Sequence, residues 1–245
     1  MYSPSMLFLL SFFIALPPFS AGEFGLTQNL NKQQRVSILK VLGLGSAGKS
    51  VSSPQGLGVD HGLEVSLANE FINTESISQY LDGDRSKNTL YYPKIYIGKG
   101  IYEHLDLFIH FIPYTATLGL SEFGGTIRLH FLNAKTSPLS ISTIFGMNSA
   151  NFNNELTLRT VNADLSLGLN WTFYSLFTSI GVADVNGTFV GGTNGTTDSL
   201  VNETEQTSHL HFSIGSVFRY NIYFMALALD RYSDSVYTIK IGCHF

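Results

Sequence analysis

The chain has 245 residues, which is enough for one large β domain or two ordinary domains. Only 13% of them are charged, about half of the share usual in soluble domains, while aromatic residues also reach 13% and the mean hydropathy is +0.14. A net charge of −4 without a basic stripe argues against a nucleic-acid partner, and a single cysteine, Cys243, excludes an internal disulfide.

Residues 1–22 have the pattern of an export signal. Residues 6–16 form an apolar core of eleven residues, which is too short to span a bilayer as a helix. Pro17 and Pro18 end this core, and the small residues 20–22 offer a cleavage site, although residues 1–5 contain no Lys or Arg. No other segment approaches the roughly 18 apolar residues of a membrane helix, so a chain that enters a membrane must do so as a closed β-barrel.

Residues 23–61 form a distinct N-terminal segment. Within it, residues 29–44 predict a short helix that ends at Gly43 and Gly45. The segment is interpreted in two ways, as a plug inside a barrel or as a helix or tether in the periplasm.

The same segment contains a full match to the phosphate-binding motif G-x-x-x-x-G-K-S/T at residues 43–50. Phosphate binding requires a helix directly after the Lys-Ser pair, because its free N–H groups meet the phosphates. The chain instead continues through Ser52 and Ser53 to Pro54, which cannot begin a stable helix. We therefore expect a glycine-rich connector and no nucleotide, metal or other cofactor.

Residues 62–245 alternate between apolar and polar side chains with the period of β-strands. About ten segments follow this pattern, most of them close to the 9–11 residues that a tilted membrane strand needs. The segments are 63–71, 91–97, 105–111, 123–131, 139–148, 161–171, 174–182, 209–218, 223–230 and 237–245. The predicted fold class is all-β, a transmembrane up-and-down antiparallel barrel.

The connections between these segments alternate in predicted length. Long polar gaps fall at 72–89, 112–122, 149–160 and 186–208, and short gaps separate most of the remaining pairs. The short gap at 231–236 is an exception, since a long one is expected there. Outer-membrane barrels show this asymmetry, with short periplasmic turns and long external loops, and an even strand count places both chain ends in the periplasm.

Several charged residues fall on the predicted inner face. Asp106 and His110 lie on the segment next to Arg128 and His130, and Glu64 and Glu70 on the first segment neighbour Lys240 on the last when the barrel closes. We interpret these residues as a salt-bridge network that fills a narrow lumen; a selectivity lining and a catalytic role are the alternatives. One wall instead carries small inward side chains, which leave room for residues 23–61: Ser140, Ser142, Gly146, Asn148, Ser166, Gly168 and Ser179.

The last segment has a specific pattern. Tyr237, Ile239, Ile241, Cys243 and the terminal Phe245 alternate along it. In this it resembles the Gram-negative outer-membrane β-barrel proteins, which characteristically end in an aromatic residue preceded by alternating apolar residues. The resemblance implies that this strand is recognised by the barrel-assembly machinery and that the chain resides among outer-membrane lipids of the bacterial cell.

The function expected from the sequence is a structural or surface role, or a narrow passive channel, without catalysis. One alternative is a barrel enzyme, a protease or lipid hydrolase, for which His209, His211 and Asp230, with the hydroxyls of Thr207 and Ser208, are the candidate residues. The other alternative is a secreted soluble β-sandwich, because such a fold also alternates.

Overall fold

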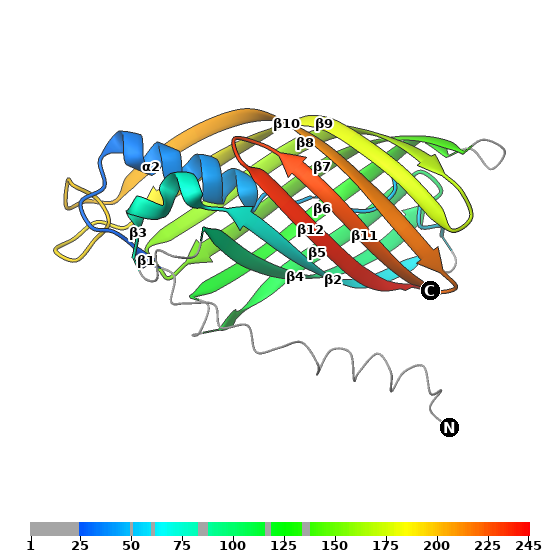
Figure 1. The fold of residues 1–245 in the computed structure, drawn as a ribbon, viewed down its shortest axis with the longest axis horizontal. Helices are drawn as coiled ribbons and strands as arrows, with labels where there is room; N and C mark the ends of the chain where they lie inside the picture. The colour runs from blue at the N-terminus through cyan, green and yellow to red at the C-terminus, as the bar shows by residue number, and fades with distance from the viewer. Residues whose placement is uncertain (1–24, 50, 60–61, 83–87, 116–118, 134–137) are drawn as a thin grey trace, which may run out of the picture.

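The computed structural model describes residues 25–49, 51–59, 62–82, 88–115, 119–133 and 138–245; the predicted export signal lies outside these ranges. Ten antiparallel strands form one closed barrel (Figure 1), and each strand pairs with its neighbours in the chain. The strands are β2 (Leu63–Asn73), β4 (Thr89–Tyr102), β5 (Leu105–Thr115), β6 (Leu120–Asn133), β7 (Leu139–Phe152), β8 (Leu156–Asn170), β9 (Tyr174–Phe189), β10 (Glu203–Tyr220), β11 (Tyr223–Arg231) and β12 (Ser235–His244).

The barrel closes where the last strand meets the first. β12 pairs with β2 from Val236 opposite Ile72 to His244 opposite Glu64. The backbones of Leu63 and Phe245 extend this ladder, with the Phe245 N–H donating to the Leu63 carbonyl at 2.8 Å. Closure leaves no unpaired strand edge, which is the condition for a sheet to exist in hydrocarbon.

The two faces of the barrel differ in chemistry. Large apolar side chains cover the outside on every side, and Phe123, Met147 and Leu210 are each 65–69% exposed. Charged and small polar side chains point inward, where Glu70, Lys94 and Arg128 are at most 1% exposed. A continuous apolar exterior of this extent is far larger than monomeric soluble proteins expose, so the barrel is of the membrane-spanning type. The soluble β-sandwich alternative is wrong, because the ten strands close into a single barrel and the large apolar side chains of its outer face are exposed.

The connections agree only in part with the expected lengths. The β2–β4 connection carries the short helix η2 (Glu75–Tyr80) and strand β3 (Leu81–Asp82), and the β9–β10 loop spans residues 190–202. The expected long gap at 149–160 is wrong, because β7 and β8 are joined by residues 153–155 alone, and the gap at 112–122 shrinks to 116–119. Strands continue through polar sequence there because the barrel extends beyond its apolar belt, and β10 reaches 18 residues.

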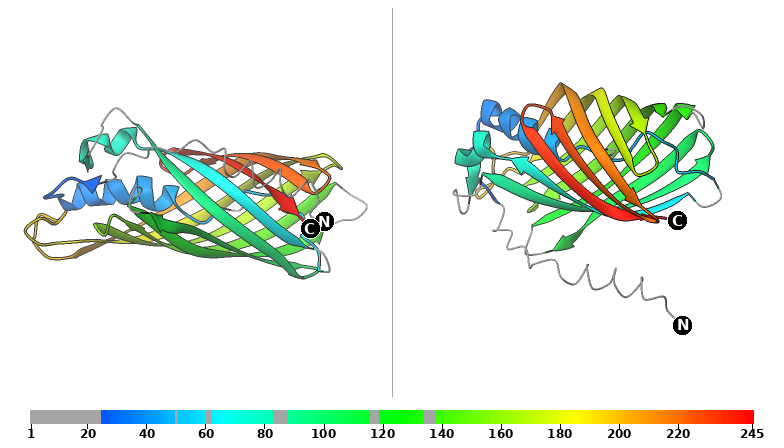
Figure 2. Two further views of the ribbon diagram at one scale, coloured as in Figure 1. Left: turned by 90° about the horizontal axis from the view of Figure 1, so that it is seen from below. Right: turned by 45° about the vertical axis from the view of Figure 1, so that its right-hand side comes forward.

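The N-terminal segment enters the barrel from the end that carries the β2–β4 connection and the β9–β10 loop, which we call the loop end. The opposite end, which carries the β4–β5 and β8–β9 turns, is the turn end. Strand β1 (Gly25–Leu26) pairs with β3, and helix α2 (Lys32–Ile38) continues as a π-helix, η1 (Leu39–Gly43). Figure 2 (left) shows this helix at the end of the barrel opposite the C-terminus. No helix within the described residues is long and apolar enough to cross a bilayer.

The expectation that both chain ends lie on one side holds for the barrel strands but not for the first residues that the structure describes. The barrel itself begins at Leu63 and ends at Phe245 at the same end, as an even strand count requires. Gly25 lies at the other end, because residues 44–49 and 51–57, between α2 and β2 in the chain, contact inward side chains of the barrel wall. The N-terminal residues that the structure describes are therefore not on the side of the C-terminus.

Candidate functional site

The lumen and the segment that occupies it form the candidate site. At the loop end, helix α2 begins with a capping box, in which Asn31 accepts from the Gln34 N–H and the Gln34 side chain accepts from the Asn31 N–H. One turn further, Arg35 donates to Glu205 at 2.9 Å, to Asp198 at 2.9 Å and to the Leu30 carbonyl at 2.6 Å. Burial disfavours the Arg35 charge, but the Glu205 and Asp198 carboxylates outweigh it and raise the pKa of the guanidinium. Arg35 thus fixes the helix to β10 and the β9–β10 loop.

The glycines of residues 43–48 have a steric role. A Cβ on Gly43 would lie 2.6 Å from a Val185 methyl carbon, and one on Gly45 would lie 2.9 Å from a methyl carbon of Ile72. A Cβ on Gly48 would lie 3.2 Å from the His110 ring. The three glycines therefore let the backbone pass through a narrow part of the lumen, and this requirement accounts for the spacing that resembles a phosphate-binding motif.

Lys49, the lysine of that motif, is occupied by the barrel wall. Its side chain is 2% exposed, and its ammonium group donates to Glu70 Oε2 at 2.7 Å and to the Gly45 carbonyl at 2.5 Å. On the strands, Lys94 lies 3.5 Å from Glu70 Oε1 and 3.2 Å from Glu122 Oε1, and His110 lies 3.0 Å from Glu122 Oε1. Two lysines and two glutamates therefore balance in charge, and Lys49 offers no free ammonium group to a phosphate.

Backbone carbonyls of the segment also bond to the wall. Asn148 on β7 and Lys94 on β4 both donate to the Ser46 carbonyl, at 3.1 and 3.0 Å, and Thr160 on β8 donates to the Gly43 carbonyl at 3.3 Å. The small residues expected on this wall supply the room, since a Cβ on Gly168 would lie 2.5 Å from the Pro54 ring.

Further toward the turn end, Arg128 holds residues 52–55. Its guanidinium donates to Ser52 Oγ, to the Ser53 carbonyl and to the Gln55 carbonyl at 2.7–3.1 Å. The same group donates to Asp106 Oδ2 at 2.8 Å, and His130 Nε2 lies 2.8 Å from that oxygen. One arginine thus joins two strands and the N-terminal segment.

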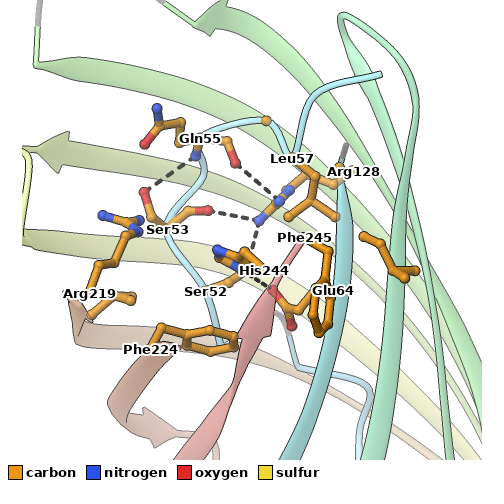
Figure 3. A pocket seen from close by; sticks show the side chains of 14 residues that line it. Ser52, Ser53, Gln55, Leu57, Glu64, Arg128, Arg219, Phe224, His244 and Phe245 are labelled. Atoms are coloured by element: carbon orange, nitrogen blue, oxygen red, sulfur yellow. Dashed lines mark hydrogen bonds and ion pairs between the residues drawn. The ribbon is translucent and has the colours of Figure 1, made fainter. Parts of the chain in front are cut away.

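At the turn end the lumen widens into a cavity of about 230 Å³ (Figure 3). Glu64 lies in its wall between Lys240 at 2.6 Å and His244 at 2.9 Å, and Arg219 donates to Ser175 at 2.6 Å. Phe224 stacks on His244 with ring centroids 4.5 Å apart. The cavity is bounded by residues 52–57 and by the final residue, Phe245.

The structure brings most of the predicted network residues together, but with different partners in part. Asp106, Arg128 and His130 form one group, and Lys240 pairs with Glu64. Glu70, expected beside Lys240, lies opposite Thr238 in the β12–β2 register and contacts Lys49 and Lys94. His110 contacts Glu122, which sequence analysis had placed in a connection.

The candidate catalytic group does not assemble as sequence analysis placed it. His211 Nε2 lies 2.5 Å from Asp164 Oδ1, and its ring stacks on Tyr232 at 4.5 Å. Asp230 is buried beside them in a narrow cavity whose wall includes Lys49 of the N-terminal segment. Ser208 is exposed, unlike the buried His211, because residues three positions apart on a strand face opposite sides.

The C-terminal strand presents most of its signature outward. Tyr237 is 56% exposed, Ile239 43% and Phe245 53%, whereas Cys243, between Val65 and Tyr223 in register, is buried. This exposed aromatic and aliphatic edge lies at the barrel seam.

Comparison with known proteins finds no matching family model and no matching curated protein. Solved structures with a similar barrel include the KdgM porin in complex with disordered oligogalacturonate, at 9% identity and a TM-score of 0.39, covering 74% of this chain and 99% of the porin. They also include the N-terminal β-barrel domain of Pseudomonas aeruginosa OprF (12% identity, TM-score 0.33, covering 74% and 97%) and Ail, the attachment invasion locus protein of Yersinia pestis (10%, 0.30, 74% and 94%). This low likeness says nothing about ligand or activity, and the ten-strand barrel is established by the chain's own closed ladder.

Proposed function

We propose that this chain is an outer-membrane β-barrel protein of Gram-negative bacteria whose lumen is plugged by its own N-terminal segment. Its role is structural or presents a surface to the medium, and it does not provide an open channel. The observation that carries the proposal is the bonding of residues 43–55 to inward side chains of β2, β4, β6, β7 and β8. Outer-membrane lipid contacts the apolar exterior, and the barrel-assembly machinery binds the C-terminal strand.

The proposal includes no catalytic step. The only close His–carboxylate pair among the proposed catalytic candidates, His211 with Asp164, lies in the narrow cavity that Lys49 helps to wall off. A substrate would have to displace the N-terminal segment to reach it. This enclosure favours a structural role for the pair.

Single-channel recording tests the plug. The refolded full chain is compared in planar bilayers with a variant that lacks residues 25–55, and resistance to SDS without heating serves as the control for a folded barrel. We expect the full chain to be nearly non-conducting and the deletion variant to conduct. Steady conductance of the full chain equal to that of the variant would contradict the plug.

The deletion variant should also prefer cations. Six carboxylates on the described strands face the lumen below the loop end, and four cationic side chains accompany them. They are Glu64, Glu70, Asp106, Glu122, Asp164 and Asp230, with Lys94, Arg128, Arg219 and Lys240. Rings of excess negative charge favour cations in a water-filled pore, so the reversal potential in a KCl gradient should shift toward that of K⁺.

A further inference from the structure

The direction in which the N-terminal segment passes through the barrel is defined at both ends. At the loop end, Gly25 and Leu26 pair with Asp82 and Leu81 in the β2–β4 connection. The Leu26 N–H donates to Glu155 Oε2 in the β7–β8 turn at 2.7 Å, and burial raises the pKa of this carboxyl group. Residues 25–26 therefore tie together two separate connections of the same end.

The β9–β10 loop is joined to the same segment. The Leu30 N–H donates to the Thr196 carbonyl at 2.7 Å, Leu30 forms a bridge with Thr197, and Arg35 bonds to Asp198. Leu30, Thr196 and Thr197 are all buried. The first described residues are thus an integral part of the loop-end surface.

At the other end the segment leaves the lumen beside the short turns. Arg128 holds Gln55, and the Gly100 N–H donates to the Gly62 carbonyl at 2.8 Å near the β4–β5 turn. The chain then continues directly into β2 at Leu63. The segment therefore crosses the full length of the barrel from the loop end to the turn end.

We infer that the barrel carries the N-terminal end of the chain to the cell exterior, where it organises the external loops into one surface. The inference rests on the proposed function, because the outer-membrane orientation, with short turns in the periplasm, makes the loop end external. It reverses the usual arrangement in which the residues before the first strand stay in the periplasm.

Cysteine accessibility in intact cells tests the inference. Three single substitutions at exposed positions are compared: Lys32→Cys on α2, Thr193→Cys in the β9–β10 loop and Thr172→Cys in the β8–β9 turn. The unsubstituted chain, whose Cys243 is buried, gives the background. Each is treated with a membrane-impermeant maleimide before and after the outer membrane is permeabilised, and a periplasmic protein with an exposed cysteine serves as the control for leakage.

We expect Lys32→Cys and Thr193→Cys to label in intact cells and Thr172→Cys to label at least tenfold less until permeabilisation. If Thr193→Cys labels in intact cells but Lys32→Cys does not, the inference fails while the orientation of the barrel stands. If Thr172→Cys labels and Thr193→Cys is protected, the orientation in the proposed function fails and external display fails with it. Conductance of the full chain is a separate readout of the plug and does not depend on orientation.

Discussion

The buried pair between Lys49 and Glu70 offers the sharpest test of a seated N-terminal segment. Replacing Lys49 with Met keeps the length of the side chain but removes its charge, which leaves the four-residue cluster with an excess negative charge. Breaking a buried ion pair by removing one partner costs about 3–5 kcal/mol. Glu70 remains 3.5 Å from the ammonium group of Lys94, so we expect a smaller loss of stability of the seated segment, about 2 kcal/mol.

Hydrogen exchange of backbone amides in the N-terminal segment measures this loss of stability directly. The Ser46 N–H donates to the Leu42 carbonyl at 2.9 Å and the Ala47 N–H to the Leu44 carbonyl at 3.2 Å, so both amides exchange only when the segment opens. A loss of about 2 kcal/mol corresponds to roughly 30-fold faster exchange, at 1.4 kcal/mol per factor of ten. Mass spectrometry of peptides covering residues 39–53, on protein refolded in lipid vesicles, gives the rates.

The double-mutant cycle separates the ion pair from other effects. Glu70→Gln alone leaves an excess positive charge, whereas Lys49→Met with Glu70→Gln leaves Lys94 balanced by Glu122 at 3.2 Å. We therefore expect the two substitutions to be non-additive, with a coupling of about 2 kcal/mol, so that the double variant exchanges about as fast as Glu70→Gln alone. Lys40→Met, at an exposed position of η1, should match the wild type.

A different result would refute the reasoning. A solvent-exposed ion pair contributes only about 0.2–1 kcal/mol to stability. If Lys49→Met changes exchange by less than threefold, or if the two substitutions are additive, Lys49 does not lie in a closed lumen against Glu70.

Three further predictions concern the ends and the narrow part of the segment. Gly43→Val should unseat the segment and raise conductance, because even a Cβ there would lie 2.6 Å from a side-chain carbon of the facing strand. Gly125→Ala is the control, because its Cβ would meet nothing closer than 3.5 Å, and equal conductance of the two variants would contradict the steric role. Arg35→Ala should weaken the attachment of α2 at the loop end by about 2–4 kcal/mol, because it leaves buried carboxylate and carbonyl acceptors unpaired. Protease added to intact cells should then cleave α2 faster, whereas Lys32→Ala on the same helix should not change the rate. Unchanged cleavage in both variants would show that Arg35 does not hold the helix. Phe245→Ala should lower the yield of assembled barrel in cells while refolding in detergent stays near that of the wild type, whereas an equal loss in both assays would indicate a folding role and no recognition by the assembly machinery.

The strands were predictable because lipid and lumen impose opposite chemistry on alternate side chains. Each of the ten predicted segments overlaps one of the ten barrel strands, and the C-terminal pattern marked the closing strand. Connection lengths were not predictable, since polar residues such as Thr157, Arg159 and Thr160 extend a strand beyond the apolar belt as readily as they form a loop. Composition therefore identified where the apolar belt ends but not where the hydrogen-bonded ladder ends.

The pairing inside the lumen depends on register, which alternation does not specify. Lys240 lies opposite Ala68, two residues from Glu70, and its ammonium group reaches Glu64 instead. Sequence analysis missed Lys49 and Lys94 as partners of Glu70, because one reaches it only through the path of the N-terminal segment. A signal for that path was present, because closely spaced glycines often mark a close backbone approach.

The threaded segment is held against movement in both axial directions. Sliding toward the loop end would pull on the covalent bond into β2, and sliding toward the turn end would drag helix α2 and its contacts with Thr196 and Asp198 into the lumen. A shift of a single residue would also bring side chains into the places that Gly43 and Gly45 leave free. The segment is thus fixed at both ends, and its release would require unfolding of helix α2 or cleavage of the chain.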